Sequence, residues 1–176
     1  LFEKKDYPKA LPYLSQYVSS QKKVEEQDLY QLSFCYFQSQ EWNKAIDGFK
    51  QLANIEDSLG QNSMYLLATS YLKIKDKSGA KNAFLLCATK SQNLSQKEIS
   101  LFNYAKLCIE LKEYSTAVAS LDKFMSTYPR SEYAAETKDL WITALTYSNN
   151  FAQAYEAYQL IDKPGAELLK LYPNIV

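Results

Sequence analysis

The sequence contains no histidine in its 176 residues. This absence excludes Ser-His-Asp and Cys-His catalysis, and it removes every metal site built on imidazole ligands. Only three cysteines occur, Cys35, Cys87 and Cys108, and their separations of 52 and 21 residues fit no metal-binding or redox motif. We predict buried free thiols, with a Cys87–Cys108 disulfide as the alternative. These gaps predict a chain that is not an enzyme and holds neither a metal nor a cofactor.

Glycine, proline and long apolar runs are also sparse. Four glycines and five prolines leave little room for the turns of a β protein, while 47% hydrophobic residues are enough to build a core. No apolar run is long enough to cross a membrane, so we expect no transmembrane segment in this chain. The 20 basic residues balance the 20 acidic ones without forming a basic cluster, which argues against nucleic acid as a partner.

What the sequence does contain is a regular spacing of alanines. Ala10, Ala45, Ala80, Ala117 and Ala154 follow one another at intervals of 35, 35, 37 and 37 residues. A large apolar residue comes four positions after each of them: Leu14, Phe49, Phe84, Leu121 and Tyr158. A period in the mid-thirties is typical of an array of helical hairpins. Two helices approach to about 8–10 Å only where small side chains meet, and we expect the alanines to mark these crossings.

The apolar period and the helix breakers predict ten helices. Their ranges are 8–20, 25–39, 43–54, 61–73, 78–90, 95–111, 115–127, 131–148, 151–161 and 166–171. Ser78-Gly79 is predicted to cap one helix, and Ser95 with Glu98 is predicted to form a capping box. Pro12 would interrupt the first helix, which therefore either begins late or bends.

We expect the whole chain, residues 1–176, to form one repeat array. A partial repeat covers 1–22, full repeats cover 26–58, 61–93, 98–130 and 131–163, and 164–176 begins a further repeat. Because the chain starts inside a repeat, we expect a fragment of a longer protein, whose other parts could associate with a membrane.

The repeats resemble the tetratricopeptide repeat (TPR) family. The resemblance rests on Leu32-Ser33-x-x-Tyr36 with Trp42-x-x-Ala45-x-x-x-Phe49, and on Leu67-Ala68-x-x-Tyr71 with Ala80-x-x-x-Phe84. It implies an all-α, right-handed solenoid of nine or ten helices, and a scaffold that binds a protein or peptide partner. The departures from the family pattern are Ser33 at a Gly or Ala position, Asp57 and Gln92 at Pro positions, and Lys138 at an apolar position.

A finer resemblance covers residues 124–134 and runs on to Trp141. The stretch Phe-Met-Ser-Thr-Tyr-Pro-Arg-Ser-Glu-Tyr-Ala is similar to a signature of TPR proteins of the Gram-negative envelope, such as BamD-like and Tol–Pal-associated periplasmic proteins. This resemblance implies a periplasmic or outer-membrane-associated scaffold in a bacterial cell-envelope assembly, with the cytoplasm as the alternative location.

The first helix of each repeat should line the inner, concave surface of a solenoid. On this surface we predict that a protein or peptide partner contacts aromatic rings and two lysines: Tyr30, Phe34, Phe37, Tyr65, Lys73, Phe102 and Lys106. The alternative for Phe34, Phe37 and Phe102 is packing between neighbouring repeats. Two other functions stay open: a glycan or peptidoglycan binder, because fifteen tyrosines could stack on sugars, and a helper module of a larger enzyme.

Overall fold

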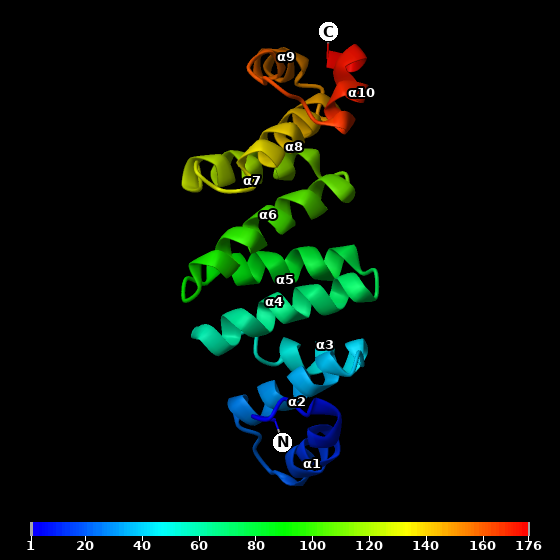
Figure 1. Ribbon diagram of the computed structural model, residues 1–176, viewed down its shortest axis with the longest axis vertical. Coiled ribbons are helices and arrows are strands. Elements are labelled where there is room, and N and C mark those ends of the chain that lie inside the picture. Colours follow the sequence, from blue (N-terminus) through cyan, green and yellow to red (C-terminus); the bar gives the residue numbers. More distant parts are fainter. Residues whose placement is uncertain (1, 176) are drawn as a thin grey trace. The chain divides into compact units, whose positions relative to one another are not determined.

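The computed structural model describes residues 2–175, which form ten α-helices and no strand (Figure 1). The helices are α1 (Tyr7–Ser20), α2 (Glu26–Gln38), α3 (Trp42–Lys50), α4 (Ser58–Lys73), α5 (Lys77–Thr89), α6 (Leu94–Glu110), α7 (Tyr114–Thr127), α8 (Ala134–Tyr147), α9 (Phe151–Gln159) and α10 (Ala166–Ile175). All ten predicted helices are present, and the all-α class is confirmed. The largest differences are that α3 ends four residues early and α10 continues four residues further.

The chain divides into two compact units, the first ending at Ser100 and the second beginning at Leu101, within α6. In the first unit, α1 packs on α2, α2 on α3 and α4, α3 on α4, and α4 on α5. In the second unit, α7 packs on α8, α8 on α9, and α10 on both α8 and α9. Within each unit, helices therefore pack on their neighbours in sequence, as stacked hairpins do.

The spaced alanines lie in the core, as predicted. Ala10 is 3% exposed, and Ala45, Ala80, Ala117 and Ala154 are 0% exposed. The crossing of α2 and α3 explains why Ser33 can replace the expected Gly or Ala. A Cβ atom on Gly48 would lie 1.9 Å from the Ser33 Oγ atom, so the glycine on α3 makes room for the serine on α2. In the next hairpin, two alanines, Ala68 and Ala83, stand at the positions of Ser33 and Gly48.

The hairpin turns repeat one backbone conformation. Five residues before each spaced alanine stands a residue with positive φ, between 58° and 63°: Lys5, Gln40, Lys75, Lys112 and Asn149. At the fourth turn, the Lys112 N–H donates to the Ile109 carbonyl at 2.9 Å, and the Glu113 N–H donates to the Cys108 carbonyl at 2.8 Å. This pair of bonds is the Schellman motif that ends a helix with a left-handed residue. The sequence does not reveal it, because none of the five residues is glycine.

Two predicted helix caps are wrong. The Asp76 carboxylate, not Ser78, caps α5 by accepting from the Gly79 N–H at 2.8 Å. At the start of α6, the Asn93 side chain accepts from the Gln96 N–H at 3.0 Å, in place of the predicted capping box. In both cases a carboxylate or amide stands immediately before the helix, where its oxygen reaches the free N–H groups of the first turn.

Pro12 lies inside α1, which begins at Tyr7, so a late start is excluded. Pro8 stands in the first turn of this helix, where its missing N–H breaks no helical hydrogen bond.

All three cysteines are free and buried, as predicted, and the disulfide alternative is wrong. Burial raises the pKa of Cys35 to about 11, so this thiol stays neutral and unreactive near pH 7.

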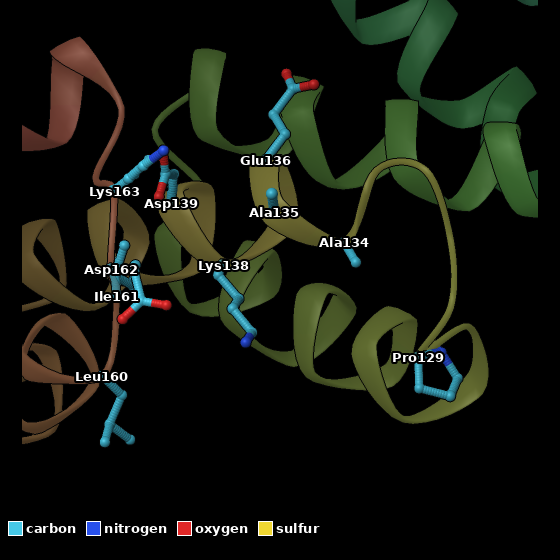
Figure 2. Close-up of a pocket in the computed structure, with 10 residues that line it drawn as sticks. All are labelled: Pro129, Ala134, Ala135, Glu136, Lys138, Asp139, Leu160, Ile161, Asp162 and Lys163. Carbon is cyan, nitrogen blue, oxygen red and sulfur yellow. The ribbon is translucent and has the colours of Figure 1, made fainter.

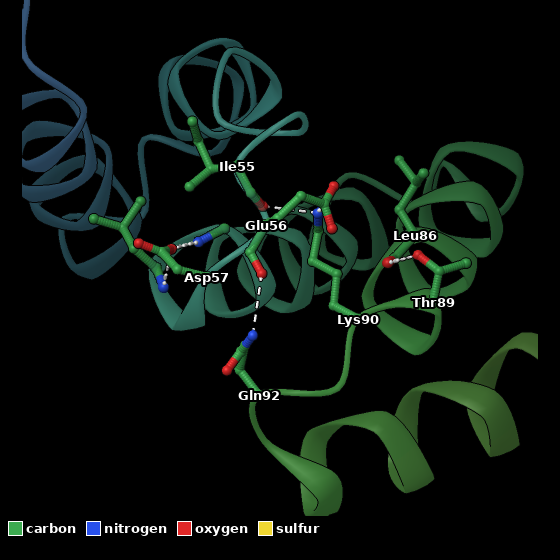
Figure 3. A network of polar contacts seen from close by, with 9 residues as sticks. Ile55, Glu56, Asp57, Leu86, Thr89, Lys90 and Gln92 are labelled. Carbon is green, nitrogen blue, oxygen red and sulfur yellow. Dashed lines mark hydrogen bonds and ion pairs between the residues drawn. The ribbon is translucent and has the colours of Figure 1, made fainter.

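A polar network joins the α3–α4 loop to the α5–α6 loop (Figure 3). The Lys90 side chain is 3% exposed, and its ammonium donates to the Ile55 carbonyl at 2.7 Å and to Glu56 Oε1 at 3.0 Å. Gln61 is 0% exposed and exchanges two hydrogen bonds with the Asn93 backbone, at 2.9 Å and 2.7 Å. Consecutive inter-repeat loops of the first unit are therefore held together by buried polar side chains.

Candidate functional site

The predicted site residues of α2 form an aromatic row in the first unit. Tyr30, Phe34 and Phe37 are half-buried, and their rings stack in sequence with centroid distances of 6.0 Å and 6.3 Å. Phe34 also meets the Tyr7 ring of α1 edge-on at 5.3 Å, and Phe37 meets Trp42 edge-on at 5.4 Å. These rings therefore pack against neighbouring helices and stay partly accessible to solvent.

Tyr30 has a structural role beyond its ring. Its hydroxyl accepts a hydrogen bond from Asn62 Nδ2 at 2.6 Å, and Asn62 Oδ1 accepts one from Gln96 Nε2 at 2.7 Å. Burial raises the pKa of Tyr30, and the bond from Asn62 opposes that rise. This chain of bonds links α2, α4 and the start of α6 within the first unit.

The two predicted residues of α4 differ in their exposure to solvent. Tyr65 is half-buried and packs edge-on against Phe84 at 6.0 Å. Lys73 is exposed, and its ammonium lies 6.0 Å from the centroid of the Trp42 ring, where a cation–π attraction operates. Leu72, beside it, is 42% exposed. We call the accessible side of Tyr30, Phe34, Phe37, Tyr65, Leu72 and Lys73 the α2–α4 surface.

The two predicted residues of the second unit are placed differently. Phe102 is 3% exposed, because its ring stacks on Tyr133 at 4.6 Å and tilts against Phe124 at 5.7 Å. The prediction that Phe102 lies on the accessible concave surface is therefore wrong. Phe102 packs against neighbouring helices, as the alternative stated. Lys106 is paired with Glu136 at 2.7 Å, and its ammonium lies 5.3 Å from the Phe102 ring centroid.

The sequence interpretation missed two adjoining cavities in the second unit. The larger, which we call the trough, has a volume of about 690 Å³ and is shown in Figure 2. It is lined by Pro129, Ala134, Ala135, Glu136, Lys138, Asp139, Leu160, Ile161, Asp162 and Lys163. The smaller, which we call the slot, has a volume of about 120 Å³ and is lined by Met125, Lys138, Trp141, Ile142, Ala157, Leu160 and Ile161. Lys138, Leu160 and Ile161 border both cavities.

The trough differs from the slot in its chemistry. The slot is bordered by apolar side chains apart from Lys138, and Leu160 at its edge is 82% exposed. In the trough, Glu136 is held by Lys106, and Asp139 Oδ2 accepts from the Gly165 N–H at 2.8 Å. The signal that could have revealed these cavities was Lys138, which occupies an apolar position of the repeat.

Within residues 2–175, no cluster of three or more His, Cys, Asp or Glu side chains is arranged to hold a metal ion. None of the described helices combines the length and the hydropathy that a membrane span requires.

The comparisons with known proteins agree with this architecture. The model of the tetratricopeptide repeat matches residues 29–55 and 100–131, which include most of α2 and α6 and all of α3 and α7. No curated protein matches the chain. The finer resemblance to envelope proteins stays a prediction.

Two solved structures share the fold. They are a Podospora anserina protein described as a kinesin light chain with nearly identical TPR-like repeats, and a single-substitution variant of it. The TM-scores are 0.58 and 0.57, both at 15% identity, over 90% of this chain and 86% of the other. Residues 29–55 and 100–131 thus match the tetratricopeptide repeat, and the chain shares the fold of a solved protein with TPR-like repeats.

Proposed function

We propose that this chain is a non-catalytic scaffold that binds a protein or peptide partner through the α2–α4 surface. The observation that carries the proposal is that α4 presents an exposed apolar side chain, Leu72, next to a cationic one, Lys73. The Lys73 ammonium lies over the Trp42 ring of α3, which packs edge-on against Phe37 of the aromatic row. TPR repeats generally mediate interactions between proteins, and the matched repeats support the same role for this chain.

The surface offers two kinds of contact. The half-buried rings are already ordered by their neighbours. They therefore lose little side-chain entropy when a partner packs on them. Leu72 supplies apolar area that is open to water in the free chain. Lys73 adds a charge that orients a partner more than it strengthens binding. We therefore expect an apolar anchor near Leu72 to contribute most of the affinity.

The test compares two leucines on opposite helices of one hairpin. Peptides are first selected on the wild-type chain from a random phage-displayed library, and their affinities are then measured for Leu72→Ser and Leu86→Ser. The two side chains are 42% and 43% exposed, but Leu86 lies on α5, the second helix of the hairpin. Leu72→Ser should weaken binding roughly 5- to 30-fold, the effect of about 1–2 kcal/mol, and Leu86→Ser should leave it unchanged.

Equal losses in both variants, or none in either, would contradict the α2–α4 surface as the binding site. The aromatic residues are less suitable for this test, because Tyr30 contacts the buried Phe49 and holds Asn62, so that removing its ring would also destabilise the fold.

We further propose, from the resemblance of residues 124–134, that the protein works in a bacterial cell-envelope assembly. In the structure this segment contributes packing, since Phe124 contacts Tyr128 at 5.2 Å and Tyr133 stacks on Phe102. Fractionation of Gram-negative cells that express the full-length gene should recover the protein with the periplasm or outer membrane. Recovery in the cytosol alone would contradict the proposed location.

A further inference from the structure

Lys138 breaks the pattern of the repeats at a position that is otherwise apolar. Sixteen residues before the spaced alanine stand Leu29, Met64 and Leu101 in the earlier repeats, and Lys138 in the last complete one. Met64 is 0% exposed, Leu101 is 7% exposed and Leu29 is half-buried, so this position places an apolar side chain in the core or at its edge. Lys138 is exposed instead.

The physical reason lies in the charge of the lysine. A buried, unpaired ammonium is strongly unfavourable, so the side chain extends toward water and covers the apolar surface only with its methylene groups. The slot lies beside Lys138, between Trp141 and Ile142 of α8, Met125 of α7, and the end of α9. We infer that the slot is the space that a leucine or methionine fills in the other repeats.

The slot has the size of one aliphatic side chain. Its volume is about 120 Å³, and an apolar protein cavity of about 150 Å³ is large enough to hold benzene. The trough of about 690 Å³ next to it has room for the backbone and the flanking residues of a peptide. Leu160, which borders both cavities and is 82% exposed, would be shielded from water by such a ligand.

The positive charge of Lys138 determines a second feature of the ligand, an acidic side chain. Figure 2 shows the Lys138 side chain pointing away from Glu136 and Asp139. Those two carboxylates already have partners, Lys106 and the Gly165 N–H, whereas Lys138 forms no ion pair with any residue in the described range 2–175. An acidic side chain close to the aliphatic one would therefore find a cation at the border of slot and trough.

We propose that the slot and the trough bind an extended peptide segment in which an aliphatic side chain, seated in the slot, is followed by an acidic residue that pairs with Lys138. The ligand class rests on the proposed scaffold function, but the two cavities lie in the second unit and share no residue with the α2–α4 surface.

The test uses an acetylated and amidated peptide, with Leu-Asp flanked by Gly and Ser residues, titrated into the isotope-labelled chain. Binding is followed by the NMR signal of the Trp141 indole N–H, because Trp141 borders the slot. We expect a saturable shift. Replacing the peptide's Leu by Ala should weaken binding at least 10-fold, and replacing its Asp by Asn should weaken it about 2- to 5-fold.

Matched variants separate the slot from the charge. Lys138→Met should fill the slot as Met64 fills its own repeat, so it should weaken peptide binding at least 10-fold and raise the Tm by about 2–4 °C. Lys138→Gln should leave the slot open and weaken binding only as much as the Asn-containing peptide does. Lys123→Met changes an exposed lysine of α7 that borders neither cavity, and it should bind as the wild type does.

The proposal is overturned if Trp141 does not respond to the peptide, if Lys138→Met binds as well as the wild type, or if that substitution lowers the Tm. Leu72→Ser should leave this peptide's binding unchanged. A loss in Leu72→Ser with none in Lys138→Met would support the α2–α4 surface and reject the slot, so that failure of one proposal is distinguishable from failure of the other.

Discussion

At the residue scale, the hairpin turns share a left-handed residue that the sequence does not reveal. The spaced alanines were predictable because a small side chain at a helix crossing is visible in the sequence. The left-handed residues were not, since lysine, glutamine and asparagine occupy positions where glycine is the usual signal. Buried Lys90 was equally hidden, because only the fold brings the Ile55 carbonyl within its reach.

The turns give a stability prediction with an internal control. Lys112→Gly should stabilise the chain by about 0.5–1 kcal/mol, because a left-handed conformation strains a lysine but not a glycine. Asn149→Gly should change stability by less than about half of that, since asparagine tolerates the same conformation at lower cost. Urea denaturation of both variants measures the difference. Destabilisation by Lys112→Gly would show that the turn is held by contacts of the lysine side chain.

At the scale of elements, the loops of the first unit are joined through Lys90 (Figure 3). Its two acceptors differ in burial, because the Glu56 side chain is 81% exposed whereas the Lys90 side chain is 3% exposed. A hydrogen bond from a charged donor to a carbonyl stabilises more than an ion pair with a solvated carboxylate does. The Ile55 carbonyl should therefore be the more important partner.

Two substitutions compare these partners. Lys90→Ala removes both contacts and the packing of the side chain, and it should cost about 2–3 kcal/mol of unfolding free energy. Glu56→Gln removes only the charge of the exposed partner, and it should cost less than about 1 kcal/mol. Chemical denaturation measures both values. Equal costs would show that the carbonyl contact is not the more important of the two.

At the scale of the whole molecule, the period of the alanines predicted the number and order of the helices because each hairpin packs mainly on its neighbours. The cavities of the second unit were not predictable in the same way. Lys138 at an apolar position marks the irregular repeat, but the shape of the cavities depends on where Leu160 and the α9–α10 link lie relative to α8, which that residue alone does not specify. Likewise, Phe102 was expected on the accessible concave surface, but the rings of Tyr133 and Phe124 bury it.

The repeat architecture predicts that an overpacked crossing loosens only nearby helices. Ala80→Leu should cost about 1–3 kcal/mol, because Ala80 is 0% exposed at the α4–α5 crossing. Hydrogen exchange should accelerate in α4 and α5 and stay unchanged in α8 and α9 of the second unit. Asn82→Leu places the same side chain on the exposed face of α5 and serves as the control. Equal acceleration in both units would indicate one global core.

The central claim is that a partner binds the α2–α4 surface, and site-specific photo-crosslinking tests it most directly. A photoreactive phenylalanine analogue is introduced at position 72 or at position 86, which are equally exposed on the two helices of one hairpin. After irradiation with a selected peptide bound, we predict a covalent adduct from position 72 and none from position 86. Adducts from position 86 alone, or equal adducts from both positions, would contradict the claim.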